Sequence, residues 1–254
     1  RAGASVFLAA PEPYLGEDIC GTYRFWANPD TALQTELGRK IFGDGLPTPM
    51  HVKKTLDNEL ISNHIDFLYS SYITDLISGT DGNPAGFVIA NRSGRQAIRA
   101  KVVIDATPRG QLARMAGAAF SRFPAGIQEV RHLVVGNQPK DIDGALRTEL
   151  PAPVVFKDKT YTAWEYVLKI NMPDDSWQSF CHAEHIARDL TWDPDQVDSG
   201  DLLFQVPPVQ IEGQRKWNQP DVDPENMSIR VFQPRKVDRM FVLSGVADMT
   251  RESA

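Results

Sequence analysis

The chain has 254 residues, of which 42% are hydrophobic and 24% are charged, with 18 glycines and 18 prolines. These values are typical of a globular protein and exclude a disordered, collagen-like or disulfide-scaffold chain. The formal net charge of -6 and the lack of a basic run argue against nucleic acid as a partner, and no apolar run approaches the ~18 residues of a membrane-spanning helix.

The first half of the chain alternates short apolar runs with helical patterns. Residues Val6–Ala10 form an apolar run that ends at Pro11-Glu12-Pro13, which predicts a buried strand followed by a loop. The pattern over Pro29–Gly38 predicts a helix, and the apolar spacing in His51–Ser62 predicts a second one. Ile65–Tyr69 then has the composition of another strand.

Three β runs follow, over Tyr72–Ile77, Ala85–Asn91 and Gln96–Ile104. Turn residues separate them, so we expect a three-stranded antiparallel meander over residues 72–104. The last run leads into Val102–Ala106, a fully apolar end that is typical of a parallel strand. Gln111–Ala119 then predicts a helix.

Beyond Pro124 the chain becomes rich in proline and its periodicity becomes short and irregular. Asp174–Leu190 is the one clear helical pattern there, and Phe241–Gly245 again predicts a buried strand that runs into a glycine. We expect Val6–Ala10, Ile65–Tyr69, Val102–Ala106 and Phe241–Leu243 to lie together in one parallel sheet.

The predicted fold class is therefore α/β, with a parallel nucleotide-binding sheet, an antiparallel meander and an inserted α+β domain. Residues 1–123 and 229–254 would form the nucleotide-binding domain, and residues 124–228 the inserted, substrate-facing domain. In open α/β sheets, ligands bind in the crevice outside the carboxyl ends of the strands. The sequence thus predicts a ligand site in the loops that follow these strands.

Four stretches resemble one known family. They are Ser5–Gly16, Tyr72–Leu76, Val102–Pro108 and Phe241–Asp248. They are similar, in that order, to the second strand and its loop, the adenine-facing segment, the ATG strand end and the late aspartate motif of FAD-dependent oxidoreductases. The resemblance is to the glutathione-reductase-like kind with two dinucleotide-binding domains, and more narrowly to bacterial flavoproteins described simply as FAD-dependent oxidoreductases.

The resemblance implies FAD as cofactor, a small-molecule substrate and an oxidoreductase activity. It also implies the cofactor-binding positions, which are Glu12, Gly16, Ile73, Ala106, Thr107, Gly245 and Asp248. Asp248 would contact the ribityl and phosphate region, or it would cap a helix from Met249 onward. Glu12 would contact the ribose or remain a solvated loop charge, and Thr107 would offer backbone groups or belong to a plain turn.

The chain also departs from the family pattern at several cofactor positions. It contains no GxGxxG loop, Ala10 stands where the ribose-binding carboxylate would fall, and Pro108 replaces the last glycine of the ATG motif. We therefore expect a fragment of a longer flavoprotein that is incomplete at both ends. By itself the fragment should bind FAD poorly, more weakly than ~10 µM, or not at all, and it should be inactive.

Other candidate chemistry is sparse. Cys20 and Cys181 lie far apart and fit a reducing compartment, so we expect a cytoplasmic protein. Cys20 has no nearby partner cysteine for a redox pair, and the cluster of Cys181, His182 and His185 lacks the further ligands of a zinc site. We expect no bound metal, and no residue is identified as a catalytic base.

Two alternatives to a flavoenzyme remain open at this point. The chain is either a non-catalytic, truncated remnant that binds no flavin, or a module that binds a carbohydrate or protein through residues 124–228. Flavin binding would separate the first interpretation from both alternatives.

Overall fold

The structure is a computed structural model that describes residues 3–25, 35–43, 45–136, 138–151, 153–204, 207–218 and 227–250. Its contacts divide the chain into two compact units: residues 1–69 with 126–203, and residues 70–125 with 204–254. Each unit has buried apolar clusters of its own. The expected division into residues 1–123 with 229–254 and an insert of residues 124–228 stays a prediction.

The first unit begins with a parallel strand pair, as predicted. Strand β1 (Phe7–Ala9) pairs with β2 (Asp66–Leu68), so that Leu8 lies opposite Phe67. The described residues between them in sequence include the helices α1 (Glu17–Cys20), α3 (Glu36–Phe42) and α4 (Pro49–Ser62). The hydroxyl of Thr48 caps α4 by accepting a hydrogen bond from the His51 amide at 3.2 Å.

The two expected helices of this region have different outcomes. The helix predicted over His51–Ser62 is confirmed as α4. Most of the helix predicted over Pro29–Gly38 lies outside the described residues, and the helix that the structure describes there, α3, begins only at Glu36. Its start is set by Thr35, whose hydroxyl accepts from the Gly38 amide at 2.9 Å.

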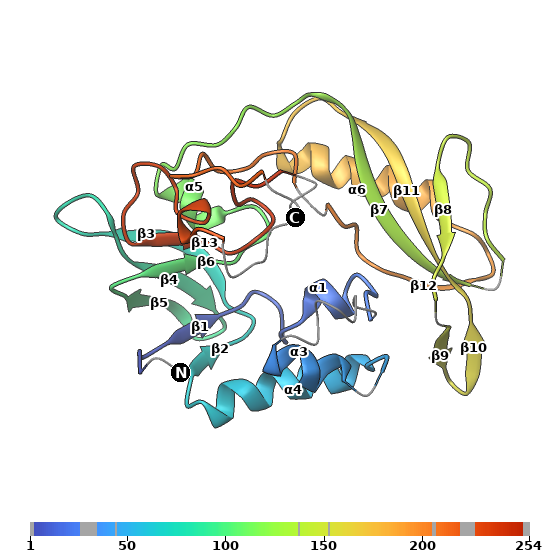
Figure 1. Cartoon of the computed structure of the whole chain (residues 1–254), viewed down its shortest axis with the longest axis horizontal. Helices are drawn as coiled ribbons and strands as arrows, with labels where there is room; N and C mark the ends of the chain where they lie inside the picture. Colours follow the sequence, from blue (N-terminus) through green and yellow to red (C-terminus); the bar gives the residue numbers. More distant parts are fainter. Residues whose placement is uncertain are drawn as a thin grey trace. The chain divides into compact units, whose positions relative to one another are not determined.

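The rest of the first unit is an antiparallel sheet with the strand order β12-β7-β11-β8. The two long central strands, β7 (Gly126–Gly136) and β11 (Ala163–Met172), pair along their whole length, and α6 (Trp177–Thr191) packs against both (Figure 1). The edge strands are β8 (Leu146–Glu149) and β12 (Gln196–Ser199). A hairpin, β9 (Val154–Phe156) and β10 (Lys159–Tyr161), precedes β11.

The second unit contains the predicted meander, which is confirmed as strands β3 (Tyr72–Ser78), β4 (Pro84–Asn91) and β5 (Gly94–Arg99). The expectation that the third strand continues to Ile104 is wrong. The strand β6 (Val103–Asp105) is separate and pairs in parallel with β13 (Met240–Val242) (Figure 1). The amide of Ala100 still donates to Ala85, but the amide of Val103 donates to Arg239, so the chain changes partner between these residues.

Helices in the second unit are short. Helix α5 (Gln111–Met115) ends earlier than the predicted Ala119, and the 3₁₀ turn η2 is Ile229–Val231. The core behind β6 and β13 includes Val103, Met240 and Val242, all buried.

The four predicted parallel strands thus form two pairs instead of one sheet. Among the described residues, β1–β2 and β6–β13 are separate two-stranded sheets, each with the predicted parallel direction. In each pair the carboxyl ends lie at the same edge. The predicted cofactor residues follow these strands, except for Ile73, which lies on β3.

Candidate functional site

The turn after β6 is built around the carboxylate of Asp105, which is 1% exposed. Its Oδ1 accepts hydrogen bonds from the Thr107 amide at 2.9 Å and the Thr107 hydroxyl at 2.7 Å, and its Oδ2 accepts from the Ala113 amide at 2.9 Å. A buried carboxylate is stable only when its oxygens are satisfied in this way. Asp105 therefore fixes the connection between β6 and α5.

Thr107 is already engaged in this turn. Its hydroxyl donates to Asp105 and also accepts from the Gln111 amide at 2.8 Å, which supports the start of α5. Ala106, in contrast, is exposed at the carboxyl end of β6. Of the two residues predicted here, Thr107 uses its hydroxyl to stabilise the turn, and Ala106 is accessible to a ligand.

The segment after β13 lies at the same edge, because Val242 pairs with Asp105 in the parallel register. It forms a turn in which the Ala247 amide donates to the Ser244 carbonyl at 3.1 Å. The side-chain amide of Gln210 donates to the Ala247 carbonyl at 2.9 Å, and this bond holds the turn against the segment that contains Gln210. Gly245 lies within the turn and is partly exposed.

Asp248 has a defined partner inside its own unit. Its Oδ2 accepts from the Gly213 amide at 3.0 Å, and a Cβ added at Gly213 would lie 2.9 Å from the Asp248 Cβ. Residues 249 and 250 are not helical, so no helix cap is seen at this position in the part that the structure describes. The carboxylate instead anchors the 210–217 segment.

Ser244 carries an unusual side chain for this edge. Its Oγ is buried and has no hydrogen-bond partner in the structure. A buried hydroxyl without a partner costs about 1–3 kcal/mol. Ser244 is the second residue after β13.

Ile73, the predicted adenine-facing position, lies on β3 with its side chain packed against the core of the second unit. Its carbonyl accepts a hydrogen bond from the Gln111 side-chain amide at 3.2 Å. This contact connects the meander to α5.

Glu12 and Gly16 follow β1 in the first unit. Gly16 has a left-handed φ of +88° at the start of α1, and an added Cβ would lie 2.9 Å from side-chain carbons of both Val52 and Leu56. Only glycine fits both the backbone conformation and the close approach to α4. The resemblance implies a cofactor role for Gly16, which stays a prediction, and the structure shows that Gly16 also packs closely against α4.

Glu12 is half-buried beside a second carboxylate, that of Glu17. Burial raises the pKa of the Glu17 carboxyl, and the negative charges of Glu12 and Asp201 raise it further. The loop after β1 is therefore a locally acidic environment.

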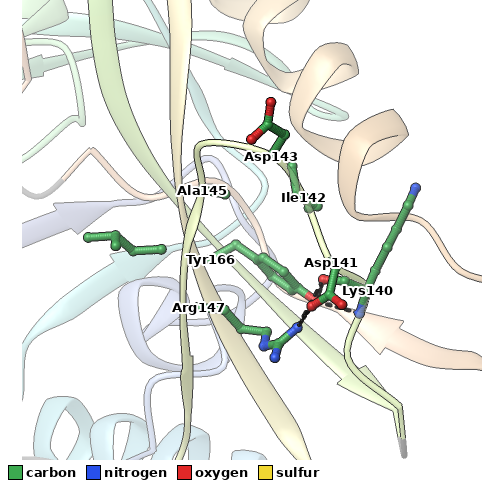
Figure 2. Close-up of a pocket in the computed structure, with 8 residues that line it drawn as sticks. Lys140, Asp141, Ile142, Asp143, Ala145, Arg147 and Tyr166 are labelled. Atoms are coloured by element: carbon green, nitrogen blue, oxygen red, sulfur yellow. Dashed lines mark hydrogen bonds and ion pairs between the residues drawn. The ribbon is translucent and has the colours of Figure 1, made fainter.

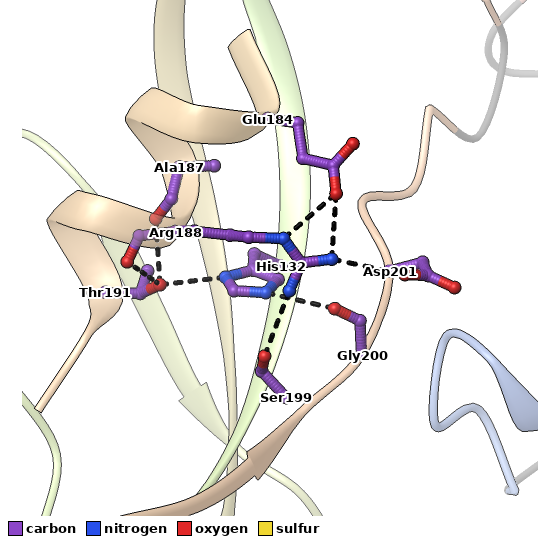
Figure 3. Close-up of polar contacts among 8 residues, drawn as sticks. All are labelled: His132, Glu184, Ala187, Arg188, Thr191, Ser199, Gly200 and Asp201. Atoms are coloured by element: carbon purple, nitrogen blue, oxygen red, sulfur yellow. Dashed lines mark hydrogen bonds and ion pairs between the residues drawn. The ribbon is translucent and has the colours of Figure 1, made fainter. Parts of the chain in front are cut away.

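A different polar network crosses the sheet of the first unit (Figure 3). His132 on β7 is 1% exposed, with Nδ1 2.8 Å from the Thr191 hydroxyl and Nε2 3.1 Å from the Gly200 carbonyl. Burial, with the nearby Arg188 cation, lowers the pKa of His132 to about 4. The neutral imidazole joins β7 to α6 and to the chain after β12.

A cavity of about 610 Å³ lies beside β8 and β11 in the same unit (Figure 2). The Tyr166 hydroxyl accepts from the Lys140 amide at 2.9 Å and donates to the Lys140 carbonyl at 3.1 Å, and Arg147 pairs with Asp141. The lining of this cavity contains both positively and negatively charged side chains, and it includes none of the predicted cofactor residues.

Few other chemically reactive groups are found in the described residues. They contain no group of three or more potential metal ligands. Cys20 is buried and its pKa is raised by burial, as in an unreactive thiol, while Cys181 is partly exposed. None of the described helices combines the length and apolar character needed to cross a bilayer.

Comparison with known proteins gives one family. Residues 25–241 match the family model described as FAD dependent oxidoreductase. No curated protein matches the chain.

The chain also resembles solved structures at low identity. BexE, studied for oxidation during BE-7585A biosynthesis, matches with a TM-score of 0.53 and 13% identity over 96% of this chain and 57% of its own. AlpK matches with a TM-score of 0.51 and 14% identity over 99% of this chain and 54% of its own. CabE, an aromatic hydroxylase from angucycline biosynthesis, reaches a TM-score of 0.49 and 12% identity, covering 96% of this chain and 56% of its own. At such identities BexE and AlpK indicate a shared fold, and the chain spans a little over half of each structure's length.

Proposed function

The chain belongs to the FAD-dependent oxidoreductase family, and we propose on that premise that it serves the flavin-mediated oxidation or reduction of a small molecule. Its cofactor is FAD. We further assign it to the glutathione-reductase-like kind, with a nucleotide-binding domain of residues 1–123 and 229–254 and a substrate-facing insert of 124–228. The observation that carries the proposal is the parallel pair β6–β13, whose two carboxyl-end turns form one edge.

The residues of this edge fit a dinucleotide. The Asp105 turn is complete without a ligand, so Ala106 is presented by a fixed backbone. Ser244 supplies a buried hydroxyl without a hydrogen-bond partner in the described part of the chain, and Gly245 allows close approach because it has no side chain. Asp248 uses only Oδ2 in its contact with Gly213.

The redox chemistry itself is supplied by the flavin when FAD is bound. The task of the chain is to bind and orient. Ala106, Thr107 and Gly245 would contact the cofactor through the backbone, and Asp248 through its second carboxylate oxygen. Glu12, Gly16 and Ile73 complete the proposed set as contacts to the adenosine part.

Titration of the purified protein with FAD, to millimolar concentrations and followed by quenching of flavin fluorescence, tests this proposal. Saturable binding is expected in the wild type. Ala106→Phe should weaken it by more than about 10-fold, because a bulky exposed side chain at the strand end blocks the edge. The matched control is Ala119→Phe, another exposed alanine of the same unit, which should bind as the wild type does.

Two results would contradict the proposal. One is a wild type that binds no FAD, which would favour a remnant or a binding module built on residues 124–228. The other is equal FAD affinity of the Ala106 and Ala119 variants, which would place the cofactor elsewhere.

A further inference from the structure

Two side chains after β13 could serve the cofactor, and the structure distinguishes them. The family resemblance points to Asp248, but its carboxylate already holds the Gly213 amide at 3.0 Å. Ser244 stands four residues earlier, and its hydroxyl has no hydrogen-bond partner among the described residues. The contacts therefore favour Ser244 over Asp248 as the side chain that is available to the cofactor.

We propose that the Ser244 hydroxyl makes a direct hydrogen bond to bound FAD, and that Asp248 acts mainly as an anchor for the 210–217 segment. This inference rests on the proposed function, since it names a further residue of the same edge.

The first step of the argument concerns energy. Buried polar atoms in folded proteins nearly always have hydrogen-bond partners, and those that lack one require an explanation. Within the part of the chain that the structure describes, Ser244 Oγ has no hydrogen-bond partner. A ligand group that is present only in the cofactor-bound protein would remove this cost.

The second step concerns position. Ser244 is the second residue after β13, and Val242 is in register with Asp105 at the end of β6. Both turns are held by the chain's own contacts, at Asp105 on one side and Gln210 on the other. Ser244 as a whole residue is only partly buried. A change from one staggered χ1 rotamer to another would therefore turn its hydroxyl towards a ligand without moving the backbone.

The third step concerns Asp248. A carboxylate that accepts from a backbone amide contributes to the stability of the free protein, because the amide would otherwise lose its partner. The buried side chain of Trp217 belongs to the same segment, and its amide donates to the Asp248 carbonyl at 2.8 Å. Asp248 is thus part of the scaffold whether or not FAD is present.

The test compares the wild type, Ser244→Ala and the control Ser93→Ala, an exposed serine in the turn between β4 and β5. Without FAD, Ser244→Ala should melt at the wild-type temperature or above it, because the substitution removes an unpaired buried hydroxyl. With FAD, its Kd should rise about 10-fold, since one hydrogen bond to a desolvated hydroxyl is lost. Ser93→Ala should match the wild type in FAD affinity.

The outcomes separate this inference from the proposed function. If the wild type binds FAD and Ser244→Ala binds it equally well, the inference is wrong while the proposed function stands. A lower melting temperature of Ser244→Ala without FAD would also overturn it, because the hydroxyl would then have a partner in the free protein. A wild type that binds no FAD refutes both.

Discussion

Protonation of His132 should govern the acid stability of the unit that contains residues 126–203. Its imidazole is neutral when folded, because burial and the Arg188 cation lower its pKa to about 4 from an ordinary value near 6.5. A group whose folded pKa is depressed binds fewer protons in the folded state than in the unfolded state. Its stabilisation is fully present above about pH 6.5 and is lost as the pH falls towards 4.

The size of the effect follows from the two pKa values. Their difference corresponds to about 3 kcal/mol of unfolding free energy between pH 7 and pH 4. This loss is large beside the 5–15 kcal/mol of total stability that is usual for a domain. His132→Gln removes the titrating group and keeps an amide that hydrogen-bonds in its place, so it should flatten this part of the pH profile.

Urea unfolding at several pH values between 7 and 4 measures the effect. The wild type should lose stability more steeply than His132→Gln, although the variant will be less stable at pH 7 because its network is imperfect. His182→Gln, which changes an exposed histidine on α6, should keep the wild-type slope. If His132→Gln loses stability with falling pH as steeply as the wild type, the assignment of a depressed pKa to this residue is wrong.

Three further substitutions test the geometry of the strand ends and the meander. Asp105→Ala should lower the unfolding free energy by more than about 2 kcal/mol in urea titrations, because three hydrogen bonds are lost from a buried turn, whereas the exposed Asp75→Ala should cost under about 1 kcal/mol. Gly16→Ala should cost clearly more in thermal melts than Gly82→Ala, since both have positive φ but only Gly16 has side chains 2.9 Å from an added Cβ; equal losses would contradict the packing argument. Gly86→Ala should disrupt the meander, seen as lost amide protection in β4 and β5, because its Cβ would lie 2.0 Å from a carbonyl oxygen of β5; retained protection would show that the strands separate easily.

The local pattern predicted those elements whose signal is contained in a few residues. Val6–Ala10 and Phe241–Gly245 are short apolar runs next to turn residues, and both are parallel strands in the structure. The meander was predictable for the same reason, since its turns carry Gly82 and Gly94 with positive φ. No glycine or proline lies between β5 and β6, so the sequence pattern predicts a single strand across both.

The long strands β7 and β11 were not predicted from the sequence, for a different reason. Residues 127–130 of β7 alternate between exposed and buried positions, but residues 132–136 are all buried, and the buried positions include the polar residues Gln128 and His132. Those side chains become acceptable only through partners such as Thr191, which lies far away in sequence. In β11 the buried alternation of Tyr166, Leu168 and Ile170 was readable, and the proline-rich composition around it obscured the signal.

The strand ends that carry the proposed site could be predicted, whereas the contacts of their side chains could not. Strand ends could be placed because apolar runs stop at polar or glycine-rich residues. The hydrogen bonds of these side chains could not be predicted from the sequence. Asp248 accepts from Gly213, which lies 35 residues away in the chain, and the lack of a partner for the Ser244 hydroxyl depends on the three-dimensional positions of all its neighbours.

The self-contained turn at Asp105 has a kinetic consequence. Because the loop is assembled by its own hydrogen bonds, a ligand arriving there does not have to order it first. Association should then proceed at the ordinary rate for docking onto a formed surface, roughly 10⁵–10⁷ M⁻¹s⁻¹, with no slow phase that is independent of ligand concentration. Substitutions around the edge should consequently change how long the ligand stays, and leave almost untouched how fast it arrives.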